Sequence, residues 1–255
     1  MRSFVNGMRV LALGCLLAVP AAATSVLPVD AGQAVDEAEL IFTGQVIDVE
    51  MVSSGDGLFP FTFVTFSVDQ TLKGAADANH LTMRFDGGDL PEREESIEVV
   101  GVPIFEVGQE VLLFVSGNGK RACPLVGWWQ GRLDFVQHPT RGTKMLVDHR
   151  GAPIEGIANG DWQRSEVRWD AAHRRLVDQE PGAKLLWQEG VSIDEPETVT
   201  AKSYRGESAD SVLDALRQLV SKRSAEKSFV RSAPVASASP LDVPESVEFT
   251  AVAGR

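Results

Sequence analysis

Residues 40–74 constrain the fold more than any other stretch, because they contain two strand-like segments joined by a turn. Apolar side chains occupy both faces of residues 40–50, which is typical of a strand covered on both sides. The side chains of residues 61–70 alternate between two faces and are rich in β-branched and aromatic types, which favours a second strand. Gly44 interrupts the first segment and predicts a bulge or a sharp bend. The stretch therefore predicts a β-hairpin that ends at Lys73-Gly74.

Shorter strand-like segments follow this hairpin, and helices are predicted near the two ends of the chain. Residues 31–39 contain helix-forming side chains, and Ser208 precedes a segment with apolar residues at helical spacing, which it can cap. Residues 89–98 are charged and predict a loop, and beyond about Gly160 the strand pattern fades. The further strands are predicted at residues 80–86, at 111–115, at 124–137 with a break or bend near Gly131, and at 143–148.

The first 23 residues have the pattern of a secretory signal peptide. Arg2 and Arg9 precede an apolar run at residues 10–19, and small residues follow it up to Ala23. This run is shorter than the about 20 residues that a membrane-spanning helix needs. Cleavage after Ala23 would leave Thr24 as the new N-terminus, and it predicts an exported protein that is periplasmic or extracellular. The alternative is a lipoprotein cleavage site at Cys15, although the apolar segment before it is short.

Charge and cysteine content exclude some classes of function. The chain carries 36 acidic and 24 basic residues, and removal of residues 1–23 takes away two arginines and no acid. An acidic exported protein repels phosphate backbones, which argues against nucleic-acid binding. Removal of the same residues leaves Cys123 as the only cysteine, so no internal disulfide can stabilise the fold. No second hydrophobic segment is long enough to span a membrane, which predicts a soluble mature protein.

Three segments in the first half of the mature chain follow one known pattern. They are AELIFTGQV at residues 38–46, VTFSVDQTLKG at 64–74 and VGQEVLLFV at 107–115. Together they resemble the netrin-like domain, the OB-type β-barrel of the tissue inhibitors of metalloproteinases, and uncharacterised bacterial secreted proteins with the same barrel. In the animal inhibitors, an N-terminal cysteine held by a disulfide presents its amine and carbonyl to the protease zinc. This chain has no cysteine near Thr24-Ser25 and nothing in its sequence that holds this segment, so those inhibitory residues have no counterpart here.

The resemblance and the strand pattern together predict a mainly β protein. We expect an OB-like antiparallel β-barrel with a short N-terminal helix and one C-terminal helix. The last part of the chain is rich in Ser, Ala, Pro and Val without a period, which is typical of a disordered tail. The predicted organisation is a signal peptide at residues 1–23, the barrel at 24–160, a Trp-containing extension ending in a helix at 161–223, and a disordered tail at 224–255.

The most unusual local sequence is CPLVGWWQGR at residues 123–132. Successive side chains of a strand point to opposite faces, so one of the two tryptophans should face outward unless the C-terminal half covers it. An outward tryptophan beside polar side chains would suit a protein or a sugar partner. The free N-terminus is the second candidate. The predicted binding residues are Thr24, Ser25, Trp128, Trp129, Gln130 and Arg132.

Three functions follow from these observations. The preferred one is an exported binding protein with a protein partner, and fold analogy suggests the regulation of a secreted protease. The alternatives are a carbohydrate-binding module that uses the tryptophans, and a hydrolase built on Cys123 with a histidine such as His138. A small buried cysteine is the simpler interpretation of Cys123. The four histidines lack paired metal-ligand spacing and no cofactor motif is present, so neither catalytic residues nor a metal or cofactor is predicted.

Overall fold

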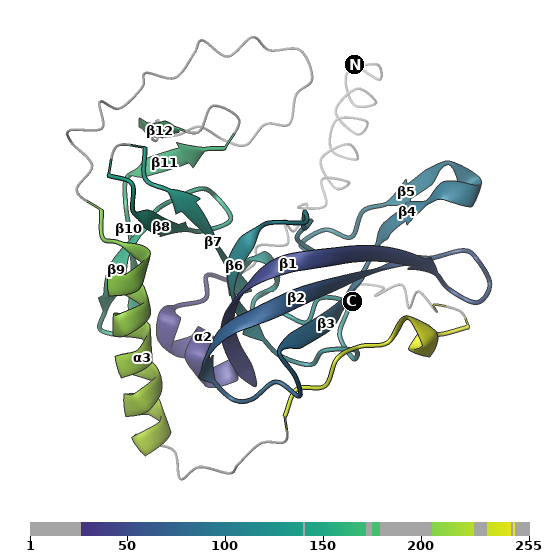
Figure 1. The fold of residues 1–255 in the computed structure, drawn as a ribbon, viewed down its shortest axis with the longest axis horizontal. Helices are drawn as coiled ribbons and strands as arrows, with labels where there is room; N and C mark the ends of the chain where they lie inside the picture. Colours follow the sequence, from purple (N-terminus) through teal and green to yellow (C-terminus); the bar gives the residue numbers. More distant parts are fainter. Residues whose placement is uncertain are drawn as a thin grey trace, which may run out of the picture.

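The computed structural model describes residues 27–139, 141–171, 175–178, 206–226, 234–245 and 247. This part of the chain is mainly β, as predicted, and contains a six-stranded antiparallel sheet and two α-helices (Figure 1). The strand order is β3-β2-β1-β6-β7-β8, so β1 lies between its hairpin partner and a strand from much later in the chain. The strands are β1 (Leu40–Ser53), β2 (Pro60–Lys73), β3 (His80–Asp86), β6 (Glu110–Val115), β7 (Arg132–Gln137) and β8 (Lys144–Val147).

The predicted hairpin is confirmed, and β1 is bent by bulges along its pairing with β2. The register shifts beside Gly44, where an added Cβ would lie 2.0 Å from the carbonyl oxygen of Ser67, so only glycine fits. A second shift around Ile47 turns that side chain outward. It returns Val49 to the face of Val46, whereas strict alternation predicted that Val49 faces the other way.

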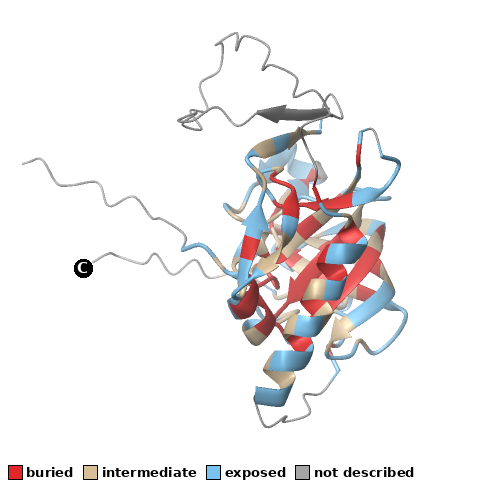
Figure 2. Ribbon diagram, turned by 90° about the vertical axis from the view of Figure 1, so that its left-hand side faces the viewer, coloured by how far each residue is buried: buried red, intermediate tan, exposed pale blue. Residues whose placement is uncertain are grey.

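Both faces of the central strands are covered, which explains their apolar residues on both sides. Along β6, Leu112 and Phe114 pack under the helices, while Val111, Leu113 and Val115 pack on the opposite face of the sheet. Figure 2 shows buried residues on the strands beneath the C-terminal helix and exposed residues on its outer side. The core is therefore two apolar layers separated by the sheet.

Each helix begins at a side-chain cap. Helix α2 (Ala31–Glu37) starts after Asp30, whose Oδ1 accepts a hydrogen bond from the backbone N–H of Gln33 at 2.6 Å. Helix α3 (Ala209–Glu226) starts after Ser208, whose Oγ accepts from the backbone N–H of Ser211 at 3.3 Å, so the predicted cap is confirmed. Arg223 of α3 forms an ion pair with Asp36 of α2 at 3.5 Å. The two helices therefore lie against each other over one face of the sheet (Figure 1).

Lys73 and Gly74 join the end of β2 to the end of α2. The Nζ of Lys73 donates hydrogen bonds to the carbonyl oxygens of Val35 at 2.7 Å and Ala38 at 2.6 Å. The last carbonyls of a helix lack partners within the helix, and a cation is favourable there. Gly74 has a positive φ of 75° and lies against the carbonyl of Glu39. Lys73 therefore stabilises the helix C-terminus, which the sequence did not predict.

Short strands occupy two regions where none was predicted. Residues 89–98 were expected to be a charged loop, but they contain the hairpin of β4 (Gly88–Leu90) and β5 (Glu95–Ile97), joined by the turn η2 (Pro91–Arg93). The strand structure also continues past Gly160, so that expectation was wrong. The additional strands are β9 (Ile154–Ala158), β10 (Asp161–Arg164), β11 (Val167–Asp170) and β12 (Arg175–Asp178).

Part of the predicted tail is ordered. Helix α3 continues to Glu226, and residues 234–245 run beside β3 and β2, with a short turn η4 (Pro240–Asp242). Figure 1 shows this segment in yellow along the outer edge of the sheet. Disorder is therefore the wrong description of residues 234–245. No helix within the described ranges has the length and apolar character needed to cross a membrane.

Candidate functional site

Trp128 is held at the surface by a turn of unusual backbone geometry. Residues 124–137 do not form one bent strand as expected, because the short 3-10 helix η3 (Trp128–Gly131) precedes β7. Gly127 and Trp128 both have positive φ, 62° and 61°, and a bulky residue rarely adopts this conformation. The side chain of Trp128 is 38% exposed. Strained backbone is retained where the surrounding structure enforces it, often at a functional site.

The side chain of Gln130 holds residues 27–29 beside this turn. Its Oε1 accepts a hydrogen bond from the backbone N–H of Val29 at 2.9 Å, and its Nε2 donates to the carbonyl of Leu27 at 3.1 Å. Val29 also packs directly over Gly127. The sequence did not predict this contact. A side-chain amide holds residues 27–29 without a disulfide, whereas the predicted N-terminus at Thr24 lies outside the described residues.

The loop between β5 and β6 also contacts the turn. Gly101 lies in contact with the rings of Trp128 and Trp129, where a side chain would collide with the Trp129 ring. Arg132 donates from Nη1 to the carbonyl of Ile104 at 2.6 Å, which fixes the next part of the loop. Two segments distant in sequence therefore meet at η3.

The segments that meet at η3 carry exposed apolar side chains. Leu27 is 80% exposed, Val100 89% and Ile104 74%, and Trp128 of η3 itself is 38% exposed. Large apolar side chains gathered in this way are typical of an interaction surface. We call the set of Leu27, Val100, Ile104 and Trp128 the N-terminal surface.

The predicted binding residues differ in their position and exposure in the structure. Trp128 belongs to the N-terminal surface and Gln130 supports it from behind. Trp129 is half-buried against Gly101 and the ring of His149, with ring centroids 5.9 Å apart. Arg132 is only 13% exposed and bonds Asp134 at 2.7 Å, so it supports the loop. Thr24 and Ser25 lie outside the described residues.

Replacement of each tryptophan by alanine should affect the stability of the fold to different extents. We expect Trp129→Ala to lower the free energy of unfolding by about 2 kcal/mol, because it removes half-buried packing. We expect Trp128→Ala to leave stability within about 0.5 kcal/mol, because its side chain is exposed. Urea unfolding followed by fluorescence measures both. Equal losses would mean that the two rings have the same packing role.

Cys123 is poorly suited to nucleophilic catalysis. Its side chain is 4% exposed within the apolar layer opposite the helices. Burial raises the pKa of its thiol to about 12, and the nearby Asp86 carboxylate adds to this rise. The reactive form of cysteine is the thiolate, which this environment disfavours. The structure therefore supports the interpretation of Cys123 as a small buried residue.

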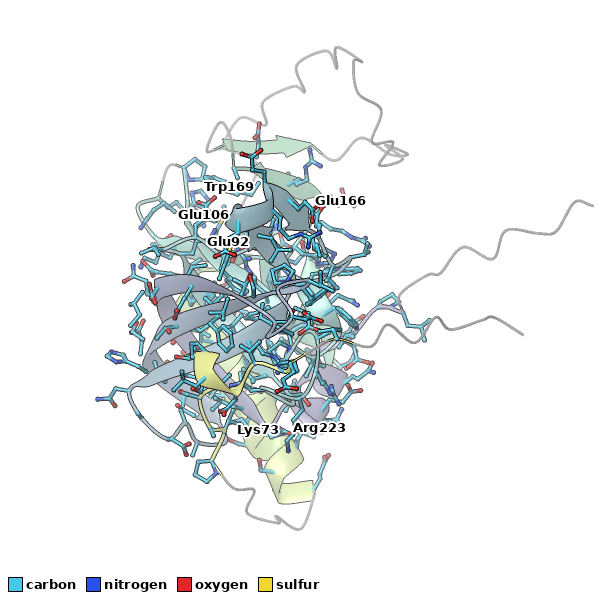
Figure 3. The ribbon with its side chains drawn as sticks, turned by 90° about the vertical axis from the view of Figure 1, so that its right-hand side faces the viewer. Lys73, Glu92, Glu106, Glu166, Trp169 and Arg223 are labelled. Carbon is cyan, nitrogen blue, oxygen red and sulfur yellow. The ribbon has the colours of Figure 1, made fainter. Side chains whose placement is uncertain are left out.

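A concave region, separate from the N-terminal surface, lies over β7 and β8, beneath β11. It encloses about 490 Å³ and is lined by Phe135, Trp169, Asp134, Arg150 and Arg168 among other residues. Trp169 lies at the end of the molecule opposite to Lys73 and Arg223 (Figure 3). Sequence reasoning did not select Trp169, because its strand was not predicted.

The buried side chain of His138 should make the stability of the fold depend on pH. Its side chain is buried, and its Nδ1 accepts a hydrogen bond from the backbone N–H of Arg141 at 3.3 Å. Burial, aided by the positive charge of Arg141, lowers the pKa of His138 below its usual value near 6.5. The unfolded chain therefore takes up a proton at higher pH than the folded chain does.

We accordingly expect this contribution to stability to be complete above about pH 6.5 and to be lost as the pH falls through that value toward the folded pKa. Urea unfolding at pH 7.5, 6.5 and 5.5 should show a smaller loss on acidification in His138→Gln than in the wild type. An equal loss in both proteins would exclude His138 as the source.

Neither a metal-binding cluster in the described part of the chain nor a similar known protein points to another site. The residues that the structure describes contain no cluster of three or more His, Cys, Asp or Glu side chains that could hold a metal ion. The N-terminal surface, where Trp128 is exposed and Gln130 holds residues 27–29, is thus the best-defined candidate site. No protein-family model and no curated protein matches this chain, so the function has to be inferred from the surface itself.

Proposed function

We propose that the chain is an exported binding protein that contacts a protein partner through the N-terminal surface. The observation that carries this proposal is the exposure of Trp128 at positive φ, on a turn that contacts the two segments carrying the exposed Leu27, Val100 and Ile104. Tryptophan is enriched among the residues that contribute most to protein interfaces. An exposed apolar side chain held by a rigid turn loses little conformational freedom on binding.

A secreted protease is the partner class that we propose to test first. If residues 1–23 are removed, the new N-terminus at Thr24 lies three residues before Leu27 in the sequence. Gln130 holds Leu27 and Val29, which is the role that the resemblance gives to a disulfide in the animal inhibitors. The OB-like, netrin-like barrel belongs to this proposal, and so does the use of the free amine at a protease zinc.

The test is inhibition of purified secreted metalloproteases by the exported chain beginning at Thr24. We expect Trp128→Asp and Leu27→Asp each to weaken inhibition at least tenfold, because each introduces a charge into an apolar contact. Leu58→Asp is the matched control, since Leu58 is 56% exposed in the turn between β1 and β2 and lies outside the N-terminal surface. Addition of one alanine before Thr24 should abolish inhibition if the amine contacts the zinc.

Two outcomes would contradict the proposal. One is the absence of binding to every protease tested at micromolar concentration. The other is an equal loss of inhibition in Leu58→Asp and Trp128→Asp, which would show that any added surface charge has the same effect.

Carbohydrate binding is a second candidate, and the concave region under β11 favours it. Trp169 and Phe135 offer aromatic surfaces there, and Asp134, Arg150 and Arg168 offer hydrogen-bonding groups. The test is fluorescence titration with soluble cell-wall oligosaccharides, in which saturable quenching should disappear in Trp169→Leu and persist in Trp128→Leu. No change in fluorescence with any sugar would rule out this function.

A further inference from the structure

The outer edge of β3 is bonded by residues from the end of the chain. β3 is the last strand of the sheet, and Thr82 directs its main-chain groups away from β2. The backbone N–H of Thr82 donates to Ser237 Oγ at 3.1 Å, and its carbonyl accepts from the N–H of Ala238 at 2.8 Å. Asn118 Nδ2 donates to the carbonyls of Thr82 and Ala236, both at 2.9 Å. Residues 234–245, here called the C-terminal strap, therefore cover this edge.

One end of the strap is fixed by a buried side chain. Val235 is 8% exposed and belongs to the apolar layer that contains Leu81 and Met83 of β3. Its backbone N–H donates to the carbonyl of Ala75 at 2.9 Å, and it pairs with Ala76 as an isolated parallel bridge. A single apolar side chain thus anchors the strap beside the turn between β2 and β3.

The other end of the strap is bonded to the turn between β1 and β2. The N–H of Gly55 donates to the carbonyl of Pro244 at 3.2 Å, and that of Asp56 donates to the carbonyl of Glu245 at 2.8 Å. Apolar side chains of the C-terminal segment cover an aromatic cluster of β2 and the residue before it. Ala238 and Val243 of the strap, and Val247 just beyond it, pack against Phe59, Phe61 and Phe63.

The strap is held in the way that folded domains hold an extended peptide. It makes main-chain hydrogen bonds to a sheet edge, and it buries one side chain in the apolar layer and others on an aromatic cluster. Pro234, Pro240 and Pro244 restrict its backbone, which lowers the entropy lost on binding. The edge of β3, with the buried site of Val235 at one end and Gly55-Asp56 at the other, therefore holds the chain's own extended segment, and we call this surface the strap groove.

We propose that this groove also accepts the strap of a second copy of the chain, so that two copies join by exchange of their C-terminal segments. The second copy is the partner that fits, because its strap supplies the same buried valine, the same main-chain groups and the same apolar side chains. Each contact of the strap with the groove is repeated between copies without a new surface. This inference uses different residues from the N-terminal surface and is independent of the proposed function.

The decisive experiment mixes two full-length variants with different tags. Val235→Asp retains the groove but loses the anchor of the strap. Thr82→Pro retains the strap but loses the N–H that donates to Ser237, and proline is tolerated on an edge strand. We expect each variant alone to be monomeric by light scattering and the mixture to form a dimer that contains both tags. A mixture that stays monomeric would overturn the proposal.

A labelled peptide of residues 234–247 provides a second measurement. It should bind Val235→Asp, whose groove is open, at least ten times more tightly than Thr82→Pro. Equal affinity for the two variants would show that the β3 edge does not bind the strap sequence. If either variant fails to fold, Val235→Ala and Asn118→Ala replace Val235→Asp and Thr82→Pro. They weaken the same two sides of the contact with less disturbance of the core. The same outcomes of the mixing and peptide experiments then support or overturn the proposal.

Discussion

Replacement of Gly74 by alanine is expected to lower the free energy of unfolding by about 2–5 kcal/mol. Gly74 has a φ of 75°, a region that costs an L-residue about 1–2 kcal/mol. An added Cβ would also lie 2.2 Å from the carbonyl oxygen of Glu39 and 3.2 Å from the Cα of Leu40. The obstacle is backbone, so the junction between α2 and β1 must move, which adds about 1–3 kcal/mol.

Gly57→Ala is the matched control for this prediction. Gly57 has a φ of 68° in the turn between β1 and β2, and nothing lies within 4 Å of the position of an added Cβ. The same backbone strain applies there without the collision, so we expect a loss of about 1–2 kcal/mol. Urea unfolding of the two variants separates the terms. Equal losses would mean that the close approach of Gly74 to Glu39 carries no energetic weight.

Lys73→Met should destabilise the protein by about 2–3 kcal/mol. Methionine retains most of the aliphatic length of lysine but cannot donate to the carbonyls of Val35 and Ala38. Hydrogen bonds from a charged group contribute about 1.5–3 kcal/mol each, and these two share one donor group. The loss should appear first as faster hydrogen exchange in α2, since the end of that helix loses its partners.

Lys120→Met is the control for the loss of a charge alone. Lys120 is exposed in the turn after β6, and we expect its replacement to change stability by less than about 0.5 kcal/mol. A similar effect of both substitutions would assign the loss in Lys73→Met to net charge. Unchanged exchange in α2 would contradict the role of Lys73 at the end of that helix.

Local patterns in the sequence predicted the parts of the fold that local physics determines. The alternation in residues 61–70 and the interruption at Gly44 predicted the hairpin and its bulge, and Ser208 predicted the start of α3. One local signal was overlooked. Asn159 and Gly160 have positive φ values of 55° and 83°, the geometry of a tight hairpin turn, and this residue pair favours such a turn.

The candidate site was predictable only in part, because its geometry depends on contacts between distant residues. The sequence predicted that one of the two tryptophans faces outward, but it did not indicate which one, and this prediction rested on a strand that does not exist. No property of Gln130 in the sequence shows that it bonds residues about a hundred positions earlier. The strap was missed because small residues and prolines without a period are also typical of disordered chains. Tertiary contacts, not local propensity, order this segment.

The position of the strap has a consequence for how the protein is made. The strands β1, β2 and β3 are complete once residue 86 has been synthesised, but the segment that covers the edge of β3 follows only at residues 234–245. At about 5–20 residues per second, the edge stays open for roughly 8–30 s during translation. An open edge invites pairing with other chains. The strap therefore closes an edge that is available to other chains until residues 234–245 have been made.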